Sequence, residues 1–235
     1  GLAAGMSSLE KVIAYAKERV QFGTTLAEKQ GYTHKLLVPN AVRLEAARAY
    51  TEEVAARLDS GEEDLQVEGS IAKYFATEVG DAMADDGIQA LGGYGYIREY
   101  EVEMIKRDAK INTIFEGTSE IQQNIISIFR LRETVRSKGG YYRSMSEELS
   151  GLPEGTGGPM VAKALWLLNE LLLVARKLKV TRSQFLMFLL ADMMTWVEVA
   201  KATCLKAGLE GREKTNSGEF MLAVARLFAR EAVEK

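Results

Sequence analysis

The sequence predicts an all-α protein, an antiparallel up-down four-helix bundle followed by a second helical unit. Apolar residues recur at helical spacing over long stretches, and no stretch shows sustained strand alternation. Only three prolines occur in 235 residues. A chain of this length can bury a large core. Long helical segments with short links between them favour antiparallel packing.

Four long helical segments form the predicted bundle, with a shorter helical piece near residues 99–108 between the third and the fourth. Residues 66–91 carry the clearest pattern, because Ile71, Phe75 and Val79 lie on one face of a helix. Pro39 falls early in the second segment, where we expect a bend or a late start of the helix. The expected segments are residues 4–20, 34–59, 66–91, 99–108 and 117–137.

The composition changes after Arg136. Glycine-rich residues 137–142 and the Gly/Pro-rich stretch 152–159 predict loop and linker. We therefore expect a bundle domain over residues 1–137, a linker over 138–158 and a second helical domain over 159–235. The expected helices of the second domain are residues 159–177, 182–208 and 215–234.

Two apolar stretches of the second domain, residues 164–175 and 185–197, raise the question of a membrane. Asn169 and Glu170 interrupt the first and Asp192 the second, well short of the ~20 clean apolar residues that a span needs. Cations between the stretches, at 176–182, suit anionic lipid or CoA phosphates. The pattern favours a buried helix pair with a solvated turn, and we expect no membrane contact.

Charge and composition exclude several classes of function. The net charge of −3, with signs interspersed, argues against a nucleic-acid partner. A single cysteine, Cys204, excludes an internal disulfide framework and fits a reducing compartment. With one histidine, His34, which we interpret as structural or solvated, we expect no metal site. The acidic clusters 62–64 and 85–86 are interpreted as structural.

Residues 115–122 (Phe-Glu-Gly-Thr-Ser-Glu-Ile-Gln) are the most informative segment. Glu116 follows an apolar shoulder and would lose solvation when a ligand closes over it, which raises a carboxyl pKa and makes a better base. Gly117 permits close approach of a ligand to the main chain. Thr118 or Ser119 could cap the next helix. Spacing alone favours an ordinary first-turn acid, because a cap followed by a Glu is a common pattern.

Two further segments suit contact with a phosphorylated ligand. Residues 89–96 (Gln-Ala-Leu-Gly-Gly-Tyr-Gly-Tyr) end a helical stretch. Their glycines indicate a C-cap and turn, or backbone opened for a cofactor. Residues 15–23 place Arg19 and Phe22 before a glycine. Arg19 either balances a negative helix end, with Phe22 in the core, or binds a pyrophosphate beside an aromatic ring.

These motifs, in this order and at these separations, resemble the C-terminal helical domain of the acyl-CoA dehydrogenase family over roughly residues 3–130. The matching patterns are Arg-x-x-Phe-Gly, Gln-x-Leu-Gly-Gly-x-Gly-Tyr, Arg-Asp-x-Lys and Phe-Glu-Gly-Thr-Ser-x-Ile-Gln. The second helical domain is similar in placement to the C-terminal extension of longer family members. The resemblance implies FAD as cofactor and an acyl-CoA thioester as substrate.

The resemblance also implies roles for individual residues. Glu116 matches the catalytic base that removes the α-proton, while the β-hydrogen leaves as hydride and a trans-2-enoyl-CoA results. Gly117 lies near the thioester carbonyl. The remaining implied positions contact FAD, in part across a subunit boundary: Arg19, Phe22, Gln30, Gln89, Leu91, Gly92, Gly93, Thr118 and Glu120.

Shared cofactor sites imply a homodimer or homotetramer, and family membership implies electron-transferring flavoprotein as a partner in fatty-acid β-oxidation. The expected location is the bacterial cytoplasm or the mitochondrial matrix. The family's N-terminal and middle domains are absent from these residues, so we expect a piece of a longer enzyme that is inactive by itself. An acyl-CoA oxidase and a helical oligomerisation module without catalysis remain alternatives.

Overall fold

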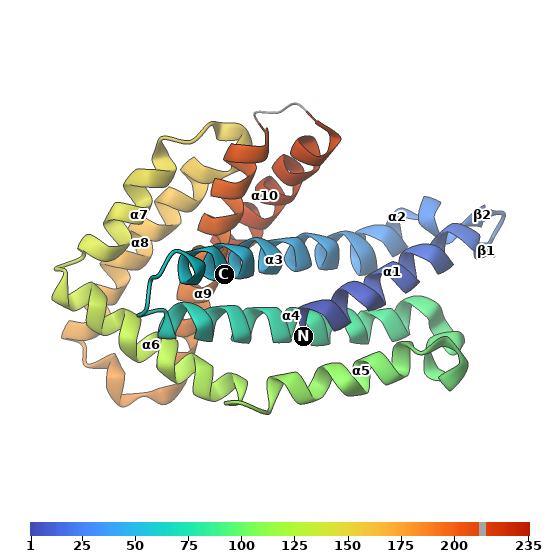
Figure 1. The fold of residues 1–235 in the computed structure, drawn as a ribbon, viewed down its shortest axis with the longest axis horizontal. Helices are drawn as coiled ribbons and strands as arrows, with labels where there is room; N and C mark the ends of the chain where they lie inside the picture. The colour runs from blue at the N-terminus through green and yellow to red at the C-terminus, as the bar shows by residue number, and fades with distance from the viewer. Residues whose placement is uncertain (212–214) are drawn as a thin grey trace. The chain divides into compact units, whose positions relative to one another are not determined.

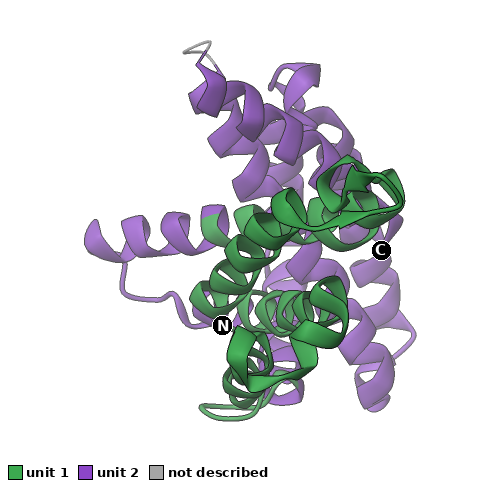
Figure 2. Ribbon diagram, turned by 90° about the vertical axis from the view of Figure 1, so that its right-hand side faces the viewer, with its two compact units in different colours: residues 1–48, 73–119 green, residues 49–72, 120–235 purple. Residues whose placement is uncertain are grey.

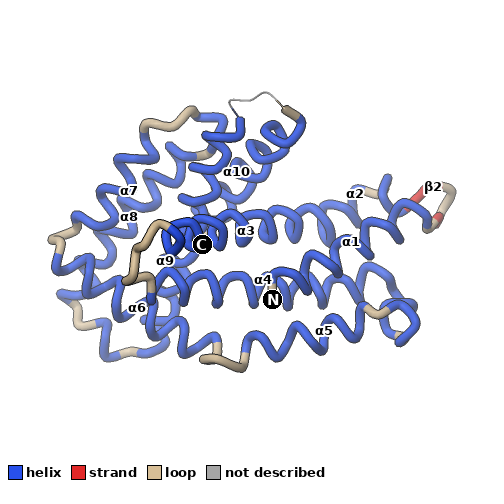
Figure 3. The backbone as a smooth tube through the Cα atoms, viewed as in Figure 1, coloured by secondary structure: helices blue, strands red, loops and turns tan. Residues whose placement is uncertain are grey.

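In the computed structural model, which describes residues 1–211 and 215–235, the chain is helical along nearly all of its length (Figures 1 and 3). The predicted all-α class is confirmed. The described residues form two compact units (Figure 2). Unit 1 comprises residues 1–48 and 73–119, and unit 2 comprises residues 49–72 and 120–235. Two helices, α3 (Val38–Asp59) and α4 (Gln66–Leu91), contribute to both units.

Within unit 1, the parts of α3 and α4 run antiparallel. Asn40 Nδ2 of α3 donates to Asp86 of α4 at 2.7 Å. Earlier in the chain, the Tyr32 hydroxyl donates to the Ala90 carbonyl, later in α4, at 3.2 Å. Two further helices of the unit are α1 (Leu2–Glu18) and α5 (Val102–Lys110).

A close approach of backbones joins α1 to α4. A Cβ atom on Gly5 would lie 2.9 Å from the Gly80 Cα, too near for any real side chain. One turn later, the buried Ser8 hydroxyl donates to the Met83 carbonyl at 3.4 Å. Glycine weakens a helix interior, and here that loss is offset by direct packing of two helices.

The region before Pro39 is irregular. Residues Gln30–Tyr32 form the short helix α2, Thr33–Leu37 form a π-helical turn, and α3 begins at Val38. Proline lacks an N–H and its ring collides with the carbonyl four residues earlier. A π-helical turn moves that carbonyl out of the regular register. The expected late start at Pro39 is confirmed by the start of α3 at Val38.

A two-residue hairpin follows α1, with β1 (Val20–Gln21) paired antiparallel to β2 (Thr24–Thr25). Phe22 and Gly23 both have positive φ, 51° and 84°, as a type I′ turn requires. Strands this short cannot show the alternation on which a sequence-based strand prediction depends. The short 3₁₀ helices of the chain are Leu26–Glu28, Gly92–Tyr96, Arg98–Tyr100, Ile111–Thr113, Glu154–Thr156 and Val180–Arg182.

Unit 2 contains five further helices. The predicted helices 159–177, 182–208 and 215–234 agree with the observed ones to within two residues. The loop prediction was wrong for residues 140–150, which form α7. Tyr142 and Leu149, two helical turns apart, are buried on one face of α7, and this spacing is helical. The helices are α6 (Ser119–Arg136), α7 (Gly140–Ser150), α8 (Gly158–Lys177), α9 (Gln184–Glu210) and α10 (Asn216–Glu234).

A buried ionic network lies in the core of unit 2. The Arg130 guanidinium donates two hydrogen bonds to Glu198, both 2.8 Å long, and one to Glu68 at 2.9 Å. The Tyr142 hydroxyl donates to Glu198 at 2.8 Å. All three charged side chains are less than a tenth exposed. Burial acts most strongly and would lower the pKa of Arg130. The charge and the hydrogen bonds of Glu198, together with the neighbouring tyrosines, outweigh burial and raise the pKa.

Helix α8 is long and apolar enough to cross a membrane by length and composition, with a mean hydropathy of 1.4. A buried helix of a globular core passes the same test. One face of α8, including Leu165, Asn169 and Leu172, is completely buried in unit 2. That α8 does not span a membrane stays a prediction.

Candidate functional site

The loop between α5 and α6 holds Glu116 in an unusual conformation. Glu116 has φ of 53° and Gly117 has φ of 90°, both in the left-handed region. A residue with a Cβ enters this region at an energetic disadvantage, and such strain clusters at functional sites. Helix α6 begins at Ser119, so Glu116 lies outside the helix rather than in its first turn. Its side chain is exposed.

Two side chains tie this loop to α4 within unit 1. Lys73 Nζ donates to the Gly117 carbonyl at 2.7 Å. The Ser119 hydroxyl donates to the Glu78 carboxylate, and also to the Thr113 carbonyl at 3.4 Å. Ser119 therefore anchors the first residue of α6 from the side. Thr118 occupies the position immediately before α6, where a capping residue belongs.

The predicted apolar shoulder beside Glu116 is on the surface. Ile111, Ile114 and Phe115 each remain about half exposed. Exposed apolar surface next to a carboxylate can be covered by a ligand, and covering it removes water from the carboxylate. The loop therefore combines a conformationally restrained acid with an apolar surface that is still open.

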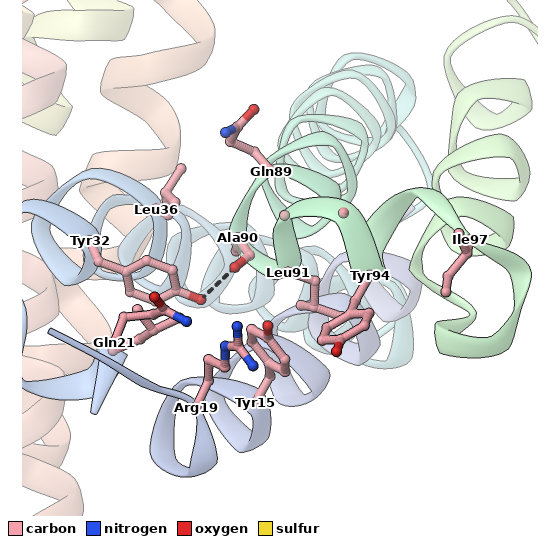
Figure 4. A pocket seen from close by; sticks show the side chains of 13 residues that line it. Tyr15, Arg19, Gln21, Tyr32, Leu36, Gln89, Ala90, Leu91, Tyr94 and Ile97 are labelled. Carbon is pink, nitrogen blue, oxygen red and sulfur yellow. Dashed lines mark hydrogen bonds between the residues drawn. The ribbon is translucent and has the colours of Figure 1, made fainter. Parts of the chain in front are cut away.

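A pocket of about 670 Å³ lies at the other conspicuous glycine motif of unit 1, where α4 ends (Figure 4). It brings together five predicted residues from two motifs about 70 residues apart in the sequence. Gly92 has φ of 61°, and a Cβ atom on Gly92 or Gly93 would meet nothing within 4 Å, so the backbone there is open. The predicted residues that line the pocket are Arg19, Gln89, Leu91, Gly92 and Gly93.

Three tyrosines of this pocket had no predicted role. The Arg19 Cζ lies 5.9 Å from the centre of the Tyr94 ring, and Tyr15 meets that ring edge-on at 6.2 Å between centres. Burial, followed by proximity to Tyr15, raises the pKa of Tyr32 to about 12. Tyr15 and Tyr94 lie inside the motifs that the sequence analysis singled out, so their position was a usable signal; Tyr32 carried none.

Four of the nine residues predicted to contact FAD lie outside the lining of this pocket. Phe22 sits at the tip of the β1–β2 hairpin and is 96% exposed, so its expected alternative as a core residue was wrong. Two residues at positive φ turn its side chain outward. Gln30 begins α2 and is exposed. Thr118 precedes α6, and Glu120 is exposed in its first turn.

The pocket and the Glu116 loop are separate places in unit 1. No residue of the loop 114–118 lines the pocket. Helix α5, nine residues and therefore about 14 Å long, lies between the 3₁₀ helix Gly92–Tyr96 and the loop (Figure 1). Among residues 1–211 and 215–235, no group of three His, Cys, Asp or Glu side chains is placed to hold a metal ion.

Comparisons with known proteins cover the same residues. The family description that matches residues 1–129 is "Acyl-CoA dehydrogenase, C-terminal domain". An acyl-CoA dehydrogenase of Bacillus subtilis is 44% identical over 54% of this chain and 33% of its own length. The caffeyl-CoA reductase–Etf complex subunit CarC of Acetobacterium woodii is 39% identical over 57% of this chain and 34% of its own length.

A solved structure extends the likeness of fold to nearly the whole chain. The acyl-CoA dehydrogenase of Bacillus anthracis, complexed with FAD, has a TM-score of 0.84, 23% identity, and covers 99% of this chain and 45% of its own. This chain spans about a third of the length of the curated relatives it matches. Because the family description covers more than half of its residues, the chain belongs to the acyl-CoA dehydrogenase family through that family's C-terminal domain.

Proposed function

We propose that this chain is part of a FAD-dependent acyl-CoA dehydrogenase that converts an acyl-CoA thioester into a trans-2-enoyl-CoA, with Glu116 as the base. The observation that carries the proposal is the left-handed conformation of Glu116 and Gly117 on a loop tied down by Lys73 and Ser119. A strained, anchored carboxylate on a family motif is better explained by a fixed chemical role than by chain folding alone.

Glu116 would act on the carbon next to the thioester carbonyl. The acyl chain covers Ile114 and Phe115, which removes water from the carboxylate and strengthens it as a base. The Glu116 carboxylate then takes the α-proton. Backbone N–H groups of the loop 116–118 are suitable donors to the carbonyl oxygen as it gains negative charge. Gly117 allows the carbonyl to approach the main chain.

The pocket at the end of α4 fits a dinucleotide cofactor. Open backbone at Gly92 and Gly93 permits close contact, and the Arg19 guanidinium suits a pyrophosphate. The nucleotide end of the cofactor would contact Phe22, which is exposed, and Gln30. Its ring system would lie against Gln89 and Leu91. Beside the base, a cofactor would contact Thr118 and Glu120. FAD, when bound, supplies the acceptor for the β-hydride.

The separation of the pocket from the Glu116 loop supports a shared site. We infer that the pocket contacts the cofactor of one protomer while Glu116 serves the cofactor of another, so the enzyme is a homodimer or homotetramer.

Electron-transferring flavoprotein is the proposed acceptor, since the Acetobacterium relative is named as a subunit of an Etf complex. We further propose a cytoplasmic or mitochondrial-matrix location, a domain boundary in 138–158, and little activity for residues 1–235 alone.

The test is anaerobic reduction of the flavin in the full-length protein by a panel of acyl-CoA thioesters. We expect bleaching with at least one thioester, and Glu116→Gln should slow it about 10²–10⁴-fold, the usual contribution of a general base. Glu10→Gln, which removes an exposed carboxylate of α1 outside the predicted site, is the matched control for loss of an acid from unit 1. It should leave the rate of flavin reduction unchanged.

Each other outcome has a definite meaning. Bound FAD that no thioester reduces would contradict the proposal. Equal rates in the wild type and Glu116→Gln would remove Glu116 from its role while leaving the family assignment intact. Rapid oxygen consumption by the reduced enzyme, without electron-transferring flavoprotein, would identify an oxidase. An assembly that never binds FAD would indicate a helical oligomerisation module.

A further inference from the structure

The loop that carries Glu116 needs support from outside its own backbone. Its first part is held locally, because the N–H groups of Ile114 and Phe115 both donate to the Ile111 carbonyl at 3.0 Å. Glu116 and Gly117 follow with φ of 53° and 90°. A residue with a Cβ atom persists in the left-handed region only when the surrounding structure fixes it there. The contacts of the loop with its surroundings therefore determine where Glu116 lies.

Lys73 of α4 supplies one such contact. Its side chain is partly buried, and its ammonium group donates to the Gly117 carbonyl at 2.7 Å. A hydrogen bond from a charged donor is about twice as strong as one between neutral groups. Because the peptide unit is planar, holding this carbonyl also fixes the direction of the peptide between Gly117 and Thr118. Glycine has the widest backbone freedom of any residue, so a restraint at Gly117 removes much of the freedom of the loop.

A second contact ties the two ends of the loop to the same helix. The Ser119 hydroxyl donates to the Glu78 carboxylate and lies 3.4 Å from the Thr113 carbonyl oxygen. Ser119 and Thr113 are both less than a tenth exposed. Glu78 follows Lys73 in α4 and lies about 7.5 Å further along the helix axis. One helix thus holds the loop at Gly117 and again at Ser119.

The contact from Lys73 bears more directly on the base than the contact from Glu78 does. Ser119 is the first residue of α6, and regular helix restrains the chain from that residue onward. Gly117 lies before the helix begins and directly after Glu116. Without the ammonium group, the chain could rotate about the backbone bonds of Gly117 and carry Glu116 with it, while α4 and α6 stay folded.

We propose that Lys73 is a positioning residue for proton removal by Glu116. Its hydrogen bond to the Gly117 carbonyl keeps the Glu116 carboxylate within reach of the α-carbon of the thioester, and the Ser119–Glu78 contact supports the same conformation. The inference rests on the proposed function of Glu116. A base must lie within hydrogen-bond distance of the proton that it removes, and a misplacement of 1 Å can slow a reaction about 10²-fold.

The first measurement is hydrogen–deuterium exchange of the full-length protein, followed by mass spectrometry of peptides that contain residues 113–119. Lys73→Met removes the ammonium group and leaves an unbranched side chain of similar length. We expect loop amides to exchange about 10–100-fold faster in this variant, the factor that corresponds to loss of one hydrogen bond from a charged group. The matched control is Lys106→Met, because Lys106 also donates to a backbone carbonyl of α4, that of Asp81, at 3.2 Å. It should leave loop exchange unchanged.

The second measurement is anaerobic flavin reduction by the thioester that reduces the wild type fastest. Lys73→Met should slow reduction about 10²-fold at saturating thioester and leave the half-saturating concentration unchanged. Lys73→Arg keeps a cationic donor and should recover most of the rate, and Lys106→Met should match the wild type. Because both contacts hold one loop, Ser119→Ala combined with Lys73→Met should slow reduction by less than the product of their separate factors.

Circular dichroism of each variant separates positioning from folding. The proposal is supported if Lys73→Met keeps the helical signal and bound FAD, speeds loop exchange and slows reduction, and if Lys73→Arg reverses both changes. It is overturned if Lys73→Met unfolds, if it leaves loop exchange unchanged, or if Lys106→Met has the same effects. Wild-type flavin that no thioester reduces would overturn the proposed function and this inference together. Normal reduction by Lys73→Met would overturn this inference alone.

Discussion

The two compact units differ in where their predicted site and their buried charges lie. The predicted site of unit 1 includes Glu116 and Gly117 at positive φ, the open backbone of Gly92 and the protruding Phe22. Unit 2 also has residues at positive φ on its surface, Lys138 and Lys179, but inside it Arg130 and Glu198 form a buried ion pair. A ligand can reach a strained residue at the surface. A ligand cannot reach a buried ion pair, which instead determines how the helices of the core pack against one another.

This difference bears on how each unit tolerates change. A strained loop at the surface loses little when a side chain is removed, because water replaces the missing contacts. A buried carboxylate that loses its partner has no water to replace it. Unit 1 should therefore respond to substitutions at its site mainly through function, and unit 2 should respond to its network mainly through stability.

The largest effect on stability is expected from Arg130→Met. Removing the guanidinium leaves Glu198 buried without a cation and leaves Glu68 with Arg57 alone, 3.4 Å away. Breaking a buried ion pair in this way destabilises proteins by about 3–5 kcal/mol. Urea unfolding followed by tryptophan fluorescence is the suitable measurement, since both tryptophans, Trp166 and Trp196, lie in unit 2.

The control for that variant is Arg230→Gln. Arg230 pairs with Glu234 at 3.4 Å, and both side chains are largely exposed. Loss of such a pair changes stability by about 0–1 kcal/mol. If Arg130→Met unfolds at the same urea concentration as Arg230→Gln, the buried network does not contribute to the stability of unit 2.

An intermediate effect is expected from two glycines of unit 1 that are separated by one residue, Gly93 and Gly95. A Cβ atom on Gly95 would lie 2.4 Å from the Ile88 carbonyl oxygen, whereas one on Gly93 would meet nothing within 4 Å. Gly95→Ala should destabilise the protein by about 1–3 kcal/mol through overpacking. Gly93→Ala should leave stability near the wild-type value. Urea unfolding monitored by circular dichroism compares them, and indistinguishable midpoints would show that the 3₁₀ segment moves to admit a side chain.

The smallest effect concerns pH and Glu53 of unit 2. Burial raises the pKa of this carboxyl above 4.5, and the charges of Glu148 and Glu198 add to it, although Lys201 lies 3.8 Å away and opposes them. The folded state thus binds the proton more tightly than the unfolded state. Stability from this group is fully present below pH 4.5 and is lost as the pH rises through the folded pKa.

Glu53→Gln removes this dependence, so the variant should gain stability relative to the wild type as the pH rises above about 4.5. Glu62→Gln is the control of opposite sign, because a hydrogen bond from Arg57 lowers the pKa of Glu62. Urea unfolding at a series of pH values measures both. A constant difference between Glu53→Gln and the wild type across the series would contradict the assigned cause.

Helices were predicted well because their signal is local and repeated. Residues 66–91 matched α4 to the residue, since many turns of one apolar face agree. Helix α7 was missed because glycines at both ends of a short segment outweighed the two buried positions, Tyr142 and Leu149, that define its face. The hairpin was missed because its strands have two residues each.

The candidate site was predicted in its chemistry and only partly in its geometry. The glycine and arginine motifs meet in one pocket, and the five residues that meet there were all named from the sequence. Tyr32 was not named, because a tyrosine at the end of a three-residue helix carries no pattern of its own. The structure was also needed to place Glu116 outside α6, which begins at Ser119. From the sequence, the same pattern is typical of an acid in the first turn of a helix.

By itself, the sequence determined the helical class, most helix boundaries and the family, because periodic apolar faces and close-set motifs are local properties. Only the tertiary structure decided which distant groups meet. It paired Arg130 with acids more than sixty residues away in the chain, and it left Leu178 and Phe185 uncovered while burying their apolar neighbours. Burial and pairing are set by the packing of whole helices, and no short stretch of sequence contains that information.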